Sequence, residues 1–216
     1  MRRERMNDVI GDYIRQHFTL YIFTIILFIM GIIYGSFLIQ SLSPSQKQEM
    51  IGYLSQFFHG LTNNGESIVS TNVALKQVLY EHLKYLVVIW FLGLSIIGMP
   101  LIFLLIFMKG FVIGFTVSFL ISQLQWKGFV FSFVSILPQN LLIVPVFIIA
   151  SVAGIAFSLS LVLSRVRKNG CSQFTLQTVL SYSFLMLIMG SILVFASGFE
   201  TYVSPNLMKS VASLFY

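Results

Sequence analysis

Long uninterrupted apolar runs separate the few charged positions of this 216-residue chain. No Lys, Arg, Asp, Glu or His occurs in five stretches, which are residues 18–46, 85–108, 110–126, 128–164 and 169–199. A helix that crosses a bilayer needs about 20 such residues. The segments of about 10 residues with alternating polarity that are typical of an outer-membrane barrel do not occur. The pattern therefore predicts an all-α, polytopic helical membrane protein.

Five transmembrane helices are predicted, at residues 19–39, 85–108, 110–123, 141–163 and 174–196. We expect Pro100 to kink the second helix, because proline removes a backbone donor. Lys109 and Gly110 form the predicted turn between the second and third helices. The run 128–164 is too long for one crossing, and we place its break at Pro138, because the residue before a proline avoids the helical region. Residues 128–137 then remain as a short re-entrant or interfacial segment.

Composition agrees with this class, since 57% of residues are hydrophobic and 9% are charged, against about 25% charged in soluble domains. The net charge of +6 flanks the apolar runs, which favours cytoplasmic anchoring of helix ends over nucleic-acid binding. The positive-inside rule then predicts a cytoplasmic N-terminus and an outer C-terminus. Eight of the 13 basic residues lie inside in this orientation: Arg2, Arg3, Arg5, Arg15, Lys109, Arg165, Arg167 and Lys168.

We therefore expect a single integral membrane domain over residues 1–216. It has a basic cytoplasmic N-terminus at 1–18, an outer amphipathic segment at 41–84 and an outer tail at 197–216. In the outer segment, Ser43, Pro44 and Gln46 form a capping-box pattern that predicts a helix start. The apolar residues that follow share one helical face: Met50, Ile51, Leu54, Phe57, Phe58 and Leu61. This face could pack on the spans, lie on membrane lipid or contact a partner protein.

The chain offers little for catalysis. Its seven acidic residues and three histidines all lie outside the apolar runs, whereas proton relays and intramembrane hydrolases need ionisable groups at membrane depth. His59 and His82 are expected to be solvated or capping residues and not metal ligands. The single Cys171 excludes an intrachain disulfide. We predict no catalytic residue, no metal and no cofactor.

Two features could serve packing or function. Gly31 and Gly35, like Gly110 and Gly114, have the four-residue spacing that lets transmembrane helices approach closely. Gly154 is a further small residue that could serve the same purpose in the fourth predicted span. Packing within one chain is the favoured interpretation, and a homodimer is the alternative. Pro138, Gln139 and Asn140 combine a helix break with two amides, which either end a re-entrant turn or line a substrate path.

Three segments are similar to one known family: HLKYLVVIWFLGLSIIGMPLIF (82–103), KGFVIGFTVSFLISQ (109–123) and LPQNLLIVP (137–145). With the basic start MRRERMNDVIGDYIRQH, the chain resembles the stage II sporulation protein M family of endospore-forming Firmicutes. The resemblance implies a role in engulfment of the forespore, in the septal and engulfing membranes. It also implies a complex with stage II sporulation proteins D and P, which are peptidoglycan hydrolases.

The expected function is therefore a non-enzymatic membrane scaffold that holds these hydrolases. The alternative is a permease-like subunit with a substrate path near the Pro138 break.

Overall fold

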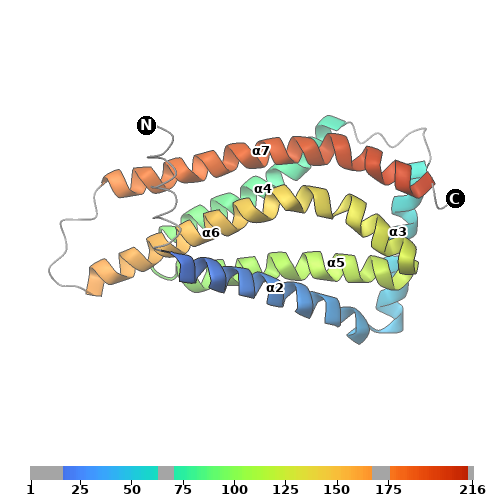
Figure 1. Ribbon diagram of the computed structural model, residues 1–216, viewed down its shortest axis with the longest axis horizontal. Helices are drawn as coiled ribbons and strands as arrows, with labels where there is room; N and C mark the ends of the chain where they lie inside the picture. Colours follow the sequence, from blue (N-terminus) through green and yellow to red (C-terminus); the bar gives the residue numbers. More distant parts are fainter. Residues whose placement is uncertain (1–16, 63–70, 167–175, 214–216) are drawn as a thin grey trace.

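The computed structural model describes residues 17–62, 71–166 and 176–213, which form six helices and, within these ranges, no strand. The helices are α2 (Phe18–Ser41), α3 (Pro44–Thr62), α4 (Thr71–Gly93), α5 (Gly98–Ser135), α6 (Leu137–Val166) and α7 (Leu176–Ser213). The bundle is elongated, with α2, α4, α5, α6 and α7 along its length and α3 across one end (Figure 1). The all-α prediction is confirmed.

Four stretches of the described chain are long and apolar enough to cross a membrane: Phe18–Ser41, Gly98–Ser135, Leu137–Leu163 and Gln177–Gly198. They are consistent with a multi-pass membrane protein. The helix α4 lies beside them in the bundle and contacts α5, α6 and α7. It is not one of the four, and it carries Lys76, Glu81, His82 and Lys84.

The predicted second span, 85–108, is two helices. The helix α4 ends at Gly93, and a turn at 94–97 leads into α5. A Cβ on Gly98 would overlap the carbonyl of Leu92, so this close reversal needs glycine. The turn predicted at Lys109 is wrong, because Lys109 lies inside α5. Pro100 does not kink a span either, since it occupies the first turn of α5, where no helical hydrogen bond is lost.

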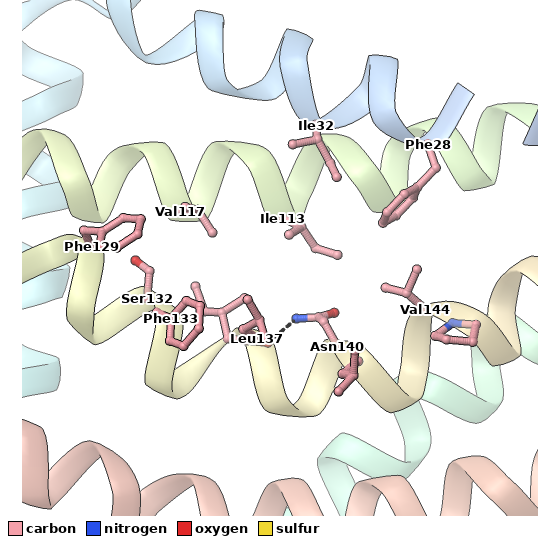
Figure 2. A pocket seen from close by; sticks show the side chains of 13 residues that line it. Phe28, Ile32, Ile113, Val117, Phe129, Ser132, Phe133, Leu137, Asn140 and Val144 are labelled. Atoms are coloured by element: carbon pink, nitrogen blue, oxygen red, sulfur yellow. Dashed lines mark hydrogen bonds between the residues drawn. The ribbon is translucent and has the colours of Figure 1, made fainter. Parts of the chain in front are cut away.

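The chain reverses a second time at Gln125, where φ is 54° and ψ is −129°. Residues 126–135 then run back along the first part of α5 and lead directly into α6 (Figure 2). The predicted re-entrant or interfacial segment 128–137 is thus helical except at Ile136, as the last part of α5 and the first residue of α6. Pro138 is the second residue of α6, a position that proline tolerates, so the break predicted there is only the junction at Ile136.

The main core lies where α4, α5, α6 and α7 meet. Near the start of α7 the Tyr182 hydroxyl donates a hydrogen bond to the Ile89 carbonyl (3.3 Å), and the Tyr182 ring stacks on Phe157 at 4.6 Å. Trp90 donates its indole N–H to the Ser183 hydroxyl (3.1 Å). These contacts fix α4 and α7 side by side and so position the polar groups that the two helices carry.

Candidate functional site

The two glycine pairs form one seam between α2 and α5. A Cβ added at Gly31 or Gly35 would overlap carbonyl oxygens of α5, and one at Gly110 or Gly114 would overlap carbonyl oxygens of α2. Small residues allow this close approach where lipid removes the hydrophobic drive for association. Because all four glycines are covered within one chain, a homodimer would need a different surface.

Two hydrogen bonds cross the same seam. The Ser36 hydroxyl donates to the Gly114 carbonyl (3.3 Å), and the Ser118 hydroxyl donates to the Ser36 carbonyl (3.2 Å). Gly154 lies in a separate contact, where an added Cβ would meet Ile102 at 3.0 Å and the Tyr182 hydroxyl at 3.3 Å. These predicted packing residues therefore bring α2 onto α5, and α6 onto α5 and α7.

A charged cluster that the sequence analysis missed lies between α4, α5, α6 and α7. The Lys109 ammonium of α5 lies 5.2 Å from the ring centre of Tyr85 and 5.1 Å from that of Phe147. Aromatic faces attract a desolvated cation. The carboxylates of Glu200 and Glu81 are close enough to add electrostatic attraction. Among the described residues, no acceptor lies within hydrogen-bonding distance of this ammonium.

His82 and Glu200 form the second part of this cluster. The His82 Nε2 and Glu200 Oε2 atoms are 3.0 Å apart, and only 10% of the His82 side chain and 19% of the Glu200 side chain are exposed. The buried Nδ1 atom of His82 has no hydrogen-bond partner in the described part of the chain. The expectation that His82 is solvated or capping is therefore wrong. Within the described ranges, no three His, Cys, Asp or Glu side chains are grouped as metal ligands.

The depth of the cluster follows from the glycine seam. Gly110, next to Lys109, packs on Phe28, which lies at the middle of the 24-residue helix α2. Lys109 thus lies level with the middle of α2, a helix that is long and apolar enough to cross a membrane. An ionisable residue at the middle of such a span is costly and marks a functional site by default. A turn was predicted at Lys109 because a glycine, Gly110, follows it directly. The better signal for the turn was the glycine at each end of Gly93–Gly98.

The residues near the predicted helix break line a cavity of about 400 Å³ between α2, α5 and α6 (Figure 2). Phe28, Ile113, Val117 and Phe133 make its wall almost entirely apolar. Asn140 also lines it, but its amide N–H donates to the Ile136 carbonyl at 2.8 Å. The cavity therefore matches a hydrocarbon group better than a polar solute.

The amphipathic helix predicted to start at Ser43 is present as α3, and its capping box is confirmed. The Ser43 N–H donates to Gln46 Oε1 (3.1 Å), and the Gln46 N–H donates to Ser43 Oγ (3.4 Å). Leu54 packs against the small cluster formed by Leu120 and Phe131, whereas Ile51 is exposed. The side chains of Phe57, Phe58 and Leu61 lie outside the described residues, as do Cys171 and the side chains of the tail from 202 onward.

Comparison with models of protein families matches residues 24–205 to one described as Stage II sporulation protein M. The chain belongs to the stage II sporulation protein M family. Searches of curated proteins and of solved structures give no match.

The match covers α2 from its second turn to the last part of α7. The glycine seam, the charged cluster and the Asn140 cavity all lie within it. Membership of the stage II sporulation protein M family makes this chain a sporulation-related membrane protein.

Proposed function

We propose that the chain is a non-enzymatic membrane scaffold that recruits and holds peptidoglycan hydrolases at the septal membrane during engulfment. Membership of the stage II sporulation protein M family supports the sporulation context. The proposed partners are stage II sporulation proteins D and P, as the sequence resemblance implies. In this role the chain positions the hydrolases at the membrane, and the hydrolases cleave peptidoglycan.

The observation that carries the proposal is the placement of α3. This helix lies across one end of the bundle instead of along it (Figure 1). Leu54 packs on the bundle end, while Ile51 and Tyr53 are exposed. Ile51 and Tyr53 are two positions apart, so they lie on opposite flanks of the line of contact at Leu54. A helix that is fastened along one line and exposes a large apolar side chain on each flank has the form of a partner-docking surface.

The proposed orientation places α3 on the outer side of the membrane, where peptidoglycan lies. Moving Lys109 to mid-membrane depth leaves seven basic residues at the cytoplasmic end, in the N-terminal segment and at 165–168. The positive-inside bias therefore keeps its direction. The N-terminus is cytoplasmic and the C-terminus is outside.

The test is co-purification of hydrolases from sporulating cells with the variant Ile51→Asp/Tyr53→Asp. Two charges on the docking surface should reduce captured hydrolase by about tenfold, which corresponds to about 1.4 kcal/mol. Gln48→Asp/Gln56→Asp is the matched control, because both positions are exposed on α3 and away from its apolar face. This control should capture as much hydrolase as the unchanged chain.

Two results would overturn the scaffold proposal. One is a capture from sporulating cells that contains no peptidoglycan hydrolase. The other is normal thinning of septal peptidoglycan in a strain that lacks the chain.

The second candidate is a permease-like subunit, and the charged cluster at Lys109 favours it. Transport sites often place ionisable groups at membrane depth. The Pro138 region favours it less, because its cavity is apolar and the Asn140 amide is bonded to the helix. Under the scaffold proposal, Gln139→Leu and Asn140→Leu leave sporulation intact. Loss of sporulation by stably folded forms of these variants would support a substrate path there.

A further inference from the structure

One face of α4 is exposed from Gln77 to Phe91. Its residues recur every three or four positions, which places them on one side of the helix. We call them the α4 face: Gln77, Tyr80, Glu81, Lys84, Val88 and Phe91. Tyr80 is 67% exposed and Phe91 is 61% exposed. The opposite side of α4 carries the buried residues His82, Leu86 and Ile89, so the helix is anchored and the α4 face is free.

The charges of the α4 face lie at membrane depth. Tyr85 packs on Lys109, and Lys109 is level with the middle of α2. Lys84 is therefore close to the level of the middle of α2, a helix apolar enough to cross a membrane, and Glu81 is about 4.5 Å nearer the α3 end at the usual helical rise. Both are exposed, and neither is ion-paired within the described part of the chain. Lipid is a poor neighbour for such side chains, because a charge near the bilayer centre costs several kcal/mol.

The α4 face is complementary to itself. A second copy in the same membrane, turned by a two-fold axis along the membrane normal, presents the same face with the same polarity. Glu81 of each copy then lies close to Lys84 of the other, with a depth offset that two long side chains span. Val88 and Phe91 meet their own counterparts in the half of the membrane nearer the 94–97 turn. In such a dimer the two α4 faces pair opposite charges with each other and apolar side chains with each other.

We propose that α4 is a dimerisation helix on which a second copy of this chain docks, with two reciprocal Glu81–Lys84 ion pairs across the interface. This interface is separate from the α2–α5 glycine seam, which is buried within each copy. It also explains how α4 can carry charges into the membrane part of the bundle.

The test is a charge swap in the purified full-length chain, with its mass measured in mild detergent and in vesicles. The unchanged chain should be a dimer. Glu81→Lys and Lys84→Glu each place four like charges together and should weaken dimerisation by about tenfold or more. The double variant Glu81→Lys/Lys84→Glu restores opposite charges and should restore the dimer. Helical content measured for each variant separates a lost interface from a lost fold.

Cysteine crosslinking locates the contact in the membrane of living cells. With Cys171→Ser as background, Val88→Cys should form a crosslinked dimer. Ile33→Cys, on the exposed side of α2, is the matched control and should remain monomeric. A monomeric unchanged chain, a double swap that fails to rescue, or equal crosslinking at Ile33 and Val88 would overturn the proposal. Capture by Val88→Cys of a different polypeptide in place of a second copy would overturn it as well.

Discussion

Lys109 places a cation level with the middle of α2, a helix that is apolar enough to cross a membrane. Its ammonium rests between two aromatic rings, and the nearby carboxylates of Glu81 and Glu200 add attraction. These interactions offset only part of the cost of a charge at this depth, because no acceptor among the described residues bonds to it directly. A charge that lowers stability at this position is the pattern expected of a residue that function requires.

Replacing this cation with an apolar side chain of similar length should make the protein more stable. We expect Lys109→Met to raise the free energy of unfolding by about 1–2 kcal/mol, because the desolvation cost is removed. The measurement is thermal unfolding in detergent. Lys76→Met is the control, since Lys76 is exposed near the N-terminal end of α4, and its change should be close to zero. A less stable Lys109→Met would mean that the aromatic and carboxylate contacts outweigh desolvation.

Gln125 stores backbone strain at the second chain reversal. Its φ of 54° and ψ of −129° match the first central position of a type II′ turn, which favours glycine. Gln125→Gly should therefore raise the free energy of unfolding by about 1 kcal/mol. Gln125→Ala keeps the Cβ and should give no such gain. Equal stability of the two variants in chemical unfolding would contradict the strain argument.

The α2–α5 seam is a close backbone contact between two helices, and it depends on four glycines that carry only hydrogen where other residues carry a Cβ. Gly114→Leu should force the two helices apart and lower the free energy of unfolding by about 3 kcal/mol or more. Gly198→Leu is the matched control, since nothing lies within 4 Å of an added Cβ there. Disulfide formation in Ser36→Cys/Ser118→Cys reports the seam directly. That disulfide should form in the control and fail in Gly114→Leu.

Local chemistry explains which elements the sequence could predict. The start of α3 was predictable, because Ser43 and Gln46 act on each other within one helical turn. The turn at 94–97 had only a weak local signal, the glycines that flank it, because it has no charge or proline and is stabilised from α6, where Ser158 donates to the Ser95 carbonyl (2.8 Å). Lys109 was misplaced for a similar reason. Its neighbours Tyr85 and Phe147 come from distant parts of the chain.

At the scale of the whole molecule, the bundle has two unlike ends. One end carries the start of α2 and the 94–97 turn, and the other carries α3 and the reversal at Gln125 (Figure 1). The glycine pairs were predictable as packing positions, but their pairing with each other was not, because it depends on two helices that are far apart in sequence.

Labelling from outside the cell tests the direction of the bundle. With Cys171→Ser as background, a membrane-impermeant thiol reagent should label Ser45→Cys in α3. Ile97→Cys, which is exposed in the turn at the opposite end, should be labelled only after the membrane is opened. The reverse pattern would mean that the chain is inserted with its N-terminus outside.

The glycine seam also implies a delay during synthesis between the appearance of α2 and that of its partner helix α5. Gly31 and Gly110 are 79 positions apart, so α2 enters the membrane well before its partner exists. At about 5–20 residues per second, the gap lasts about 4–16 s. During this interval the groove of α2 is open to any helix with small residues, and a chaperone or insertase that shields it would decide how many chains assemble correctly.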